Sequence, residues 1–349
     1  MPGGVRSILV LAAVSLAMGA CTGDPDSSAP RSPETVAASG SSSASSSAPS
    51  SAPSSAPGSP AEPATQPRPV DDILVERYRY RFGPDWMAVD EHGLWVRRDR
   101  APTLLIDPAS GRVLGKVSTG YELPLCQGVG AGYGEVYVCR GTDLLRVDPE
   151  TLEVRDRVRL HKEYAQGHLP AAFGRFWVLE SDGSTLTGLD PATGRVVSRF
   201  QLPARGWDLA AGPDALWVAC KVDDEVLAVD PGSGEVLLTA DVNNPEYVTV
   251  PGQVWVAGAA QTYEIDAHSG EVLDTVEGGA EPVGDIASDH RYVWVRNADA
   301  FLMQIDQETG EVVRYSSELT TGGSLAVADG DLWLTAVDES TLLRLHPET

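Results

Sequence analysis

The sequence predicts an all-β fold, a seven-bladed β-propeller with four-stranded blades, and two observations support this prediction. First, an apolar residue, then Trp or Tyr, then an aliphatic residue recur seven times at a nearly fixed period. The aromatic residues are spaced 42, 40, 40, 38, 39 and 39 residues apart: Trp95, Tyr137, Trp177, Trp217, Trp255, Trp294 and Trp333. Second, most units also contain a turn of the form Asp-x-x-Thr/Ser-Gly. A period near forty in β-rich units is typical of propellers.

The unit from Gly206 to Val242 shows how one blade is encoded. Its two middle segments are dense in apolar residues, as expected for strands buried on both faces, and its last segment alternates with polar residues. The turn that begins at Asp230 combines an Asp, which accepts backbone N–H bonds, with a Pro and two Gly. Four strands are predicted: Trp207–Ala211, Ala215–Ala219, Val226–Val229 and Glu235–Asp241.

The aspartates of these turns form a regular series that could also suggest a calcium site. They are Asp107, Asp190, Asp230, Asp266 and Asp306, with a degraded copy at Asp148. A calcium ion takes six to eight oxygen ligands, whereas each turn offers one carboxylate and a Gly. The pattern therefore predicts capped turns.

The last unit predicts how the ring closes. It contains three strands, Gly323–Ala328, Asp331–Ala336 and Thr341–His346, and lacks an outer one. The strand-like segment Asp72–Tyr80 has no blade of its own, and its Tyr residues alternate with Arg residues. We expect this N-terminal strand to pair with the outside of the last blade, because that hides a sheet edge and ties the termini together.

The first seventy residues predict export and anchoring. Arg6 precedes an apolar run, Ile8–Met18, which is too short to span a bilayer as a helix. We expect a signal peptide over residues 1–20 and lipidation of Cys21, since Met18-Gly19-Ala20-Cys21 is similar to a bacterial lipobox; the alternative is an ordinary cleaved signal peptide. Residues 21–70 are rich in Ser, Ala and Pro and predict a disordered tether, followed by the propeller over 71–349. The predicted location is the extracytoplasmic side of the cell membrane.

Charge limits the partners that the domain can have. The formal net charge is −24, and the tether contributes little of it. Such an acidic surface repels phosphate backbones and anionic headgroups, which argues against nucleic acid and against membrane contact other than through the lipid. We expect a monomer whose partner is a protein, a peptide or a small molecule at a propeller face.

The repeat units resemble those of a known group of propellers. Leu/Val-Trp-Val paired with Ile/Val-Asp-Pro-x-Thr/Ser-Gly-x-Val is similar to the YVTN/YncE-like seven-bladed propellers over about Asp72 to Thr349. The units are also similar to streptogramin lyases and, more distantly, to quinoprotein propellers. This resemblance implies the fold far more strongly than an activity, because such propellers serve many purposes.

The two enzymatic relatives can be compared with this chain residue by residue. Quinoprotein dehydrogenases carry a docking Trp shortly after the Thr-Gly turn, where this chain has aliphatic residues such as Val197 and Val313, so no quinone or other cofactor is expected. Streptogramin lyases resemble the chain around His168 and Glu180, but they need a second His. The matching positions hold Asp208 and Tyr247. We therefore expect no catalytic residue here.

Chemically capable side chains recur where the inner strands begin. Inner strands line the central channel, so these residues are predicted to ring one mouth and to form a binding site. The predicted binding residues are Asp85, Trp86, His168, Trp207, Asp208, Glu246, Tyr247, Asp285 and Ser324. The alternative is that a channel mouth is polar because it is wet, with the two Trp covering blade ends.

Three cysteines follow Cys21. Cys126 and Cys139 flank neighbouring strands joined by a turn, so the antiparallel register predicts a disulfide between them in an exported domain. Cys220 faces the other way and is expected to be a buried free thiol. Three cysteines without neighbouring His argue against zinc, and no metal site is predicted.

Three hypotheses of function follow from the sequence. The favoured one is a membrane-anchored lipoprotein whose propeller is a non-catalytic binding or scaffold module. The first alternative is a metal-dependent lyase or lactone hydrolase with its site at the channel mouth. The second is a sensor or accessory domain of a membrane assembly.

Overall fold

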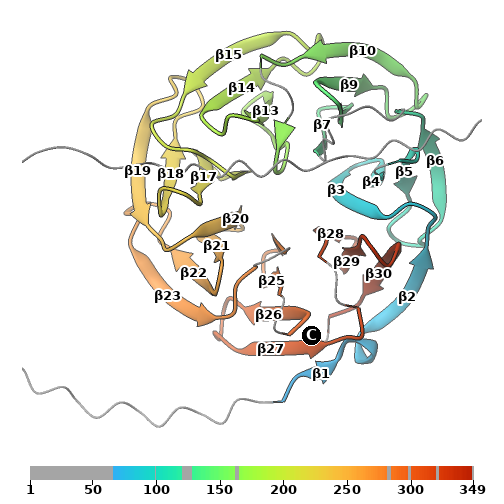
Figure 1. The fold of residues 1–349 in the computed structure, drawn as a ribbon, viewed down its shortest axis with the longest axis vertical. Helices are drawn as coiled ribbons and strands as arrows, with labels where there is room; N and C mark the ends of the chain where they lie inside the picture. Colours follow the sequence, from blue (N-terminus) through green and yellow to red (C-terminus); the bar gives the residue numbers. More distant parts are fainter. Residues whose placement is uncertain are drawn as a thin grey trace, which may run out of the picture. The chain divides into compact units, whose positions relative to one another are not determined.

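The described part of the chain forms seven sheets that surround a central channel (Figure 1). The computed structural model describes residues 66–98, 100–119, 128–161, 165–280, 284–297, 300–319 and 322–347. The chain divides into two units, Met1–Pro60 and Ala61–Thr349, and all described residues belong to the second. The predicted seven-bladed propeller with four-stranded blades is confirmed.

The blades follow one another along the chain. Blade 1 contains β3 (Pro84–Asp90), β4 (Gly93–Arg98), β5 (Thr103–Ile106) and β6 (Val113–Val117). Blade 2 contains β7 (Val129–Gly132), β8 (Glu135–Arg140), β9 (Asp143–Val147) and β10 (Val154–Arg159). Blade 3 contains β11 (Ala165–Gln166), β12 (Ala171–Ala172), β13 (Arg175–Glu180), β14 (Thr185–Leu189) and β15 (Val196–Gln201). Blade 4 contains β16 (Asp208–Ala211), β17 (Leu216–Cys220), β18 (Glu225–Val229) and β19 (Val236–Asp241).

The remaining blades have the same order of strands from the channel outward. Blade 5 contains β20 (Pro245–Thr249), β21 (Val254–Gly258), β22 (Gln261–Ile265) and β23 (Val272–Glu277). Blade 6 contains β24 (Asp285–Ser288), β25 (Tyr292–Arg296), β26 (Leu302–Asp306) and β27 (Val312–Ser316). Blade 7 contains β28 (Leu325–Ala328), β29 (Asp331–Ala336) and β30 (Thr341–Leu345). Before the blades come β1 (Arg68–Pro69), a 3-10 turn over Val70–Asp72, and β2 (Leu74–Arg79).

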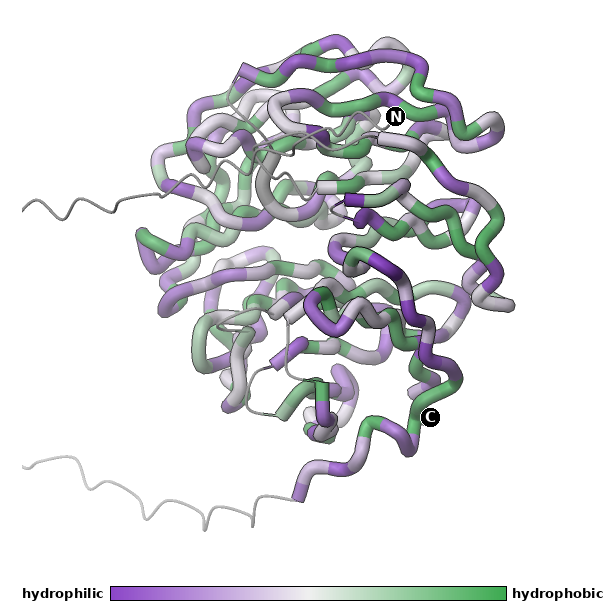
Figure 2. Tube along the Cα trace, turned by 45° about the vertical axis from the view of Figure 1, so that its right-hand side comes forward, coloured by the Kyte–Doolittle hydropathy of each residue, from purple (hydrophilic) through white to green (hydrophobic). Residues whose placement is uncertain are grey.

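The hydrophobic core is divided among the blade interfaces. The described residues form seven hydrophobic clusters, and each joins two neighbouring blades. Every cluster contains one repeat aromatic; for example, Trp217 of blade 4 packs with Val248 and Val256 of blade 5. Hydrophobic and hydrophilic stretches alternate along the coloured part of the chain (Figure 2). The repeat therefore exists because every interface needs the same large apolar side chain.

The predicted closure by the N-terminal strand is confirmed. Strand β2 pairs antiparallel with β30 on the outside of blade 7, with Leu74 opposite Leu345. The Tyr78 ring stacks on Trp333 at 5.7 Å, and a Cβ added to Gly111 of blade 1 would lie 1.7 Å from the Tyr78 hydroxyl. One side chain of β2 thus contacts both blades at the seam.

The chain preceding β2 forms a further contact that the sequence pattern did not predict. Strand β1 pairs in parallel with the outer strand β27 of blade 6, with Arg68 opposite Tyr315. Val70, placed at the end of the tether by composition, is 2% exposed and packs in the cluster between blades 6 and 7. The packed part of the chain therefore includes residues before 71, because the apolar side chain of Val70 lies in the core.

The Asp-x-x-Thr/Ser-Gly turns are capped as predicted. Asp230 Oδ1 accepts hydrogen bonds from the backbone N–H of Gly232 at 2.9 Å and of Ser233 at 2.6 Å. These hydrogen bonds hold the pKa of Asp230 below its usual range. Equivalent backbone hydrogen bonds reach Asp107, Asp148, Asp190, Asp266 and Asp306.

The cysteines are described in part. Cys220 is a buried free thiol, as predicted. Cys139 is buried and disulfide-bonded, but Cys126 lies outside the described residues, so a Cys126–Cys139 pairing stays a prediction. Cys21, the predicted signal peptide and the predicted tether up to residue 65 also lie outside the described residues. A bilayer-spanning helix is not found in the part of the chain that is described.

Candidate binding site at the channel

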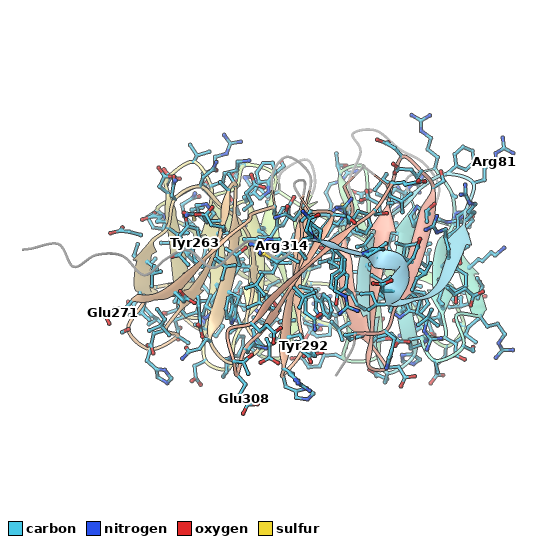
Figure 3. All side chains as sticks on the ribbon, turned by 90° about the horizontal axis from the view of Figure 1, so that it is seen from below. Arg81, Tyr263, Glu271, Tyr292, Glu308 and Arg314 are labelled. Atoms are coloured by element: carbon cyan, nitrogen blue, oxygen red, sulfur yellow. The ribbon has the colours of Figure 1, made fainter. Side chains whose placement is uncertain are left out.

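The propeller has two faces, which differ in the strand ends that they present. We call the face at which the inner strands begin the start face, and the face at which they turn into the second strands the turn face. Figure 3 shows Arg81, just before the first inner strand, toward one face, and Glu271, Tyr292 and Glu308 toward the other, the turn face. The predicted binding residues all lie at the beginning of inner strands, and therefore toward the start face.

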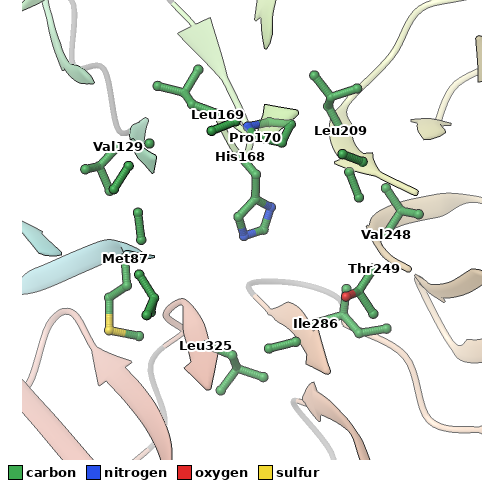
Figure 4. Close-up of a pocket in the computed structure, with 18 of the residues that line it drawn as sticks. Met87, Val129, His168, Leu169, Pro170, Leu209, Val248, Thr249, Ile286 and Leu325 are labelled. Atoms are coloured by element: carbon green, nitrogen blue, oxygen red, sulfur yellow. The ribbon is translucent and has the colours of Figure 1, made fainter. Parts of the chain in front are cut away.

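His168 projects into the channel because the inner strand of blade 3 is interrupted. Strands β11 and β12 both pair with β13, and the four residues between them face only two residues of the partner strand. Gly167 has a φ of +62°, which suits glycine. The bulge aims the imidazole at the middle of the channel, whose walls otherwise show mainly aliphatic side chains (Figure 4).

Two buried carboxylates from other blades meet His168. Its Nδ1 lies 3.0 Å from Asp208 Oδ1 of blade 4, which also accepts the backbone N–H of His168 at 3.0 Å. Its Nε2 lies 3.7 Å from Asp285 Oδ1 of blade 6. Two aromatic rings flank this centre: Trp86 contacts His168 edge-on at 4.8 Å and lies 6.3 Å from Tyr247. We call these five residues the channel plug.

The two carboxylates also join neighbouring blades. Asp208 Oδ2 accepts the backbone N–H of Val248, at 3.1 Å, in the inner strand of blade 5. Asp285 Oδ2 accepts that of Leu325, at 2.8 Å, in blade 7. Both Asp side chains are at most 1% exposed. Their first role is structural, because each satisfies backbone donors that would otherwise be buried without partners.

The charges of the plug follow from this geometry. Burial by itself would lower the pKa of His168, but the carboxylates of Asp208 and Asp285 outweigh it and raise the pKa to about 9. Burial raises the pKa of Asp285 to about 6, against the opposing effect of His168. Burial, with the same two carboxylates, also raises the pKa of Tyr247. At neutral pH the plug therefore holds an imidazolium between two carboxylates.

We expect the His168 imidazole to titrate near pH 9 in an NMR experiment, with its signal assigned through a His168→Gln variant. Because this pKa lies above the unfolded value of about 6.5, the stabilisation from His168 is complete below pH 6.5 and is lost as the pH rises through 9. Between pH 7 and 10 the parent chain should lose on the order of 3 kcal/mol more unfolding free energy than the variant. Titration near 6.5 would contradict the plug.

The other predicted binding residues are distributed differently. Trp207 is 43% exposed at the start face, and Lys221 Nζ lies 5.4 Å from the centre of its ring. Lys221 also forms an ion pair with the buried Glu246. Asp85 and Ser324 are buried in the starts of blades 1 and 7. The predicted ring is thus divided into a closed plug, an exposed Trp207–Lys221 pair, and residues within the blade walls.

Two further groups of residues could in principle serve catalysis or metal binding. Glu180, the acid that resembles the lyase pattern, is fully buried and accepts a hydrogen bond from Thr187 at 2.6 Å within its own blade. Among the described residues, Asp90, Glu91 and His92 bring three potential metal-ligand atoms together. Asp90 Oδ1, however, already accepts hydrogen bonds from the His92 backbone at 3.0 Å and from Trp95 Nε1 at 3.0 Å. This group has the geometry of a turn cap.

A cavity of about 400 Å³ runs along the channel beside the plug, and all seven inner strands contribute to its walls. Its lining carries few polar side chains, among them His168, Thr249 and Ser288. This volume lies within the range of small-ligand sites. The sequence could locate the inner strands but did not predict which end of the channel is open.

Comparison with known proteins assigns the chain to a family. The family model described as outer membrane protein assembly factor BamB matches residues 103–316, which is more than half of the chain. The chain belongs to this family. Among solved structures, this chain is similar to the computationally designed Ika8 protein, with a TM-score of 0.57 and 14% sequence identity. The match covers 79% of this chain and 98% of the Ika8 chain. At this identity the likeness shows the fold alone.

No curated protein matches the sequence significantly. The family match confirms the expected quinoprotein-like seven-bladed propeller, and a BamB-like propeller is a binding, scaffold or accessory module. The specific role within that class rests on the chain's own residues.

Proposed function

We propose that this chain is a monomeric, exported lipoprotein whose propeller is a non-catalytic binding module held at the extracytoplasmic side of the membrane. The observation that carries this proposal is that the polar residues of the channel form contacts within the ring. Asp208 and Asp285 hold neighbouring blades together, and His168 lies between them. Residues engaged in this way support a rigid ring whose surfaces recognise partners. Membership of a family described as an assembly factor agrees with an accessory role.

The exposed Trp207 is the proposed partner contact at the start face. A large aromatic side chain that is 43% exposed and lies beside a cation is the kind of anchor that contributes strongly to protein recognition. The strongly acidic net charge of the folded domain favours a partner segment with apolar and hydrogen-bonding groups over an anion.

Cys21→Ala is expected to release the protein from the membrane fraction without a change in the melting temperature of the propeller. The thioether-linked lipid would be lost, while every described residue of the fold stays the same. The measurement is fractionation of cells followed by a salt wash, with Cys220→Ala as the matched control that keeps the anchor. Retention of the Cys21→Ala chain after the wash would disprove the lipid anchor.

The non-catalytic character can be tested with divalent ions. A ligand that binds only the native state raises stability by RT ln(1 + [L]/Kd), so a metal site should appear in a thermal-shift screen with Mg²⁺, Ca²⁺, Mn²⁺ and Zn²⁺. We expect no shift. A stabilisation by one of these ions that disappears in His168→Gln would overturn the proposal in favour of a metal-dependent enzyme.

A further inference from the structure

Among the described residues, five side chains meet across the channel near its start-face end. The plug residues Trp86, His168, Asp208, Tyr247 and Asp285 come from blades 1, 3, 4, 5 and 6 and meet across the channel. The His168 imidazole joins three of these blades, with Nδ1 at 3.0 Å from Asp208 Oδ1 and Nε2 at 3.7 Å from Asp285 Oδ1. A ligand that reaches the cavity therefore enters from the other end.

Among the described wall residues, exposure increases from the plug toward the turn face. Along the inner strand of blade 1, Met87 is 3% exposed and Val89, two residues nearer the turn face, is 38% exposed. The same trend holds in other blades. Residues beside the plug are at most 3% exposed, namely Val129, Leu169, Leu209, Val248, Ile286 and Leu325, whereas the wall residues at the turn-face ends are half-buried: Ala131, Ala171, Ala211, Thr249 and Ser288.

The walls and floor of the cavity determine what could enter. The walls consist mainly of aliphatic side chains and small residues, so they favour a narrow apolar group. Among the described wall residues, the hydroxyl groups of Thr249 and Ser288 form a hydrogen bond with each other, with 2.6 Å between their oxygen atoms. At the floor, His168 is flanked by Asp208 and Asp285. One imidazolium between two carboxylates leaves a net negative charge, which disfavours an anionic group at this depth.

Two aromatic residues stand beside the opening. Tyr133 of blade 2 and Phe173 of blade 3 occupy the turns between inner and second strands, with φ values of 52° and 54°. Such positions normally favour Gly or Asn. Both rings are nevertheless exposed, by 51% and 36%, and Tyr133 Oη accepts the Gly174 backbone N–H at 2.9 Å, which joins the two turns. The pair presents aromatic faces that suit a cation or an apolar group.

Three of the other turns around the opening carry an exposed acidic residue. Glu91 of blade 1, Asp214 of blade 4 and Asp329 of blade 7 are exposed in the corresponding turns. The exposed cation Arg291 of blade 6 lies 3.3 Å from Asp306 and is thereby partly neutralised. The opening is thus an apolar hole with an acidic and aromatic border.

From these observations we infer that the channel is a one-ended pocket for a narrow apolar group carried on a cationic body, which enters from the turn face. The apolar part would lie against the inner strands, and the positive charge would remain at the border with Glu91, Asp214, Asp329 and the two aromatic rings. This inference deepens the proposed binding function, on which it rests, by naming the chemistry of a ligand. The same chemistry is offered by a small cationic amphiphile and by a basic peptide segment of a partner.

Binding of octyltrimethylammonium to the released Cys21→Ala chain tests this inference. We expect one site by calorimetry at low salt, together with a shift of the His168 imidazole NMR signal, because the octyl chain reaches the floor. Octanoate has the same tail with an anionic head, and tetramethylammonium has the head without the tail; both should bind at least tenfold more weakly. Absence of the His168 shift, or equal binding of octanoate, would overturn the inference.

A pair of matched variants locates the site. Val89→Lys places a cation in the opening at a position that is 38% exposed, and should weaken octyltrimethylammonium binding at least tenfold. Val197→Lys makes the same change on the outer strand of blade 3, where the side chain is 51% exposed, and should leave binding within about twofold. Equal effects of the two variants would mean that general charge, and not the pocket, controls binding.

A third arm distinguishes the two sources of the ligand. A Lys-rich peptide with a single Leu should displace octyltrimethylammonium if the natural ligand is a partner segment, whereas failure to displace it assigns the pocket to a small amphiphile. Trp207→Ala should not alter binding of either probe, since Trp207 lies at the start face. A channel that binds neither probe would therefore refute this pocket while leaving partner binding through Trp207 to be judged by its own variant.

Discussion

Deletion of Asp72–Tyr80 is expected to destabilise the whole propeller by about 5 kcal/mol, a large fraction of the stability of a domain. The segment includes Ile73, which is 4% exposed, and the partly buried Tyr78 and Tyr80. Burying a large apolar side chain contributes about 1.5–3 kcal/mol, and a domain has only about 5–15 kcal/mol in total. The deletion also removes the strand that covers the edge of β30.

The measurement is denaturant unfolding followed by far-UV circular dichroism, with two point variants as a graded series. Tyr78→Ala removes the ring that stacks on Trp333 and reaches Gly111, so it should cost about 2–4 kcal/mol. Val75→Ala, on the same strand but 49% exposed, should cost less than about 0.5 kcal/mol. If the deletion variant unfolds at the same denaturant concentration as the parent, the ring is not closed by β2.

Trp217→Ala is expected to cost roughly 3–5 kcal/mol, as for other buried aromatic truncations. Trp217 is 2% exposed and lies in the cluster between blades 4 and 5, where its removal leaves a cavity among Val248, Val256 and their neighbours. In a domain of this size such a loss should lower the melting temperature by about 10 °C. Differential scanning calorimetry checks the value.

Trp207→Ala is the matched control, ten positions away in the same blade. Trp207 is 43% exposed, so its truncation should cost less than about 1 kcal/mol but remove binding of a start-face partner. A cost as large as that of Trp217→Ala would show that Trp207 is a packing residue, and the proposed contact would then be withdrawn. Trp86→Ala should fall between the two, because Trp86 is half-buried against His168 in the plug.

The sequence by itself determined the architecture, because the architecture is encoded locally and repeatedly. Each unit contains its own buried second strand and its own interface aromatic such as Trp217, and the first six units also contain a turn cap such as Asp230. Closure by β2 could also be predicted, since a unit with three strands and a strand without a unit leave one economical solution. Periodicity and turn chemistry act over a few residues, which is the range that a single sequence reveals.

Only the tertiary structure decided the character of the site. The sequence placed His168, Asp208 and Asp285 in equivalent positions of different units, but it did not predict that a bulge in blade 3 would carry the imidazole to both carboxylates. A signal was present in Gly167 and Pro170, which interrupt the inner strand. The position of the imidazole depends on side chains from three blades that meet across the channel. No local sequence pattern encodes the distances between residues of different blades.

The same limit applies to the pKa values and to the open end of the channel. The pKa of His168 rises because the carboxylates of Asp208 and Asp285 lie close to the imidazole. The inferred opening at the turn face follows from the position of the plug relative to the cavity. Both properties arise from the simultaneous position of side chains from most of the blades. Local sequence specifies the strands and turns. The electrostatic environment of His168 and the cavity inside the ring exist only after the blades have packed together.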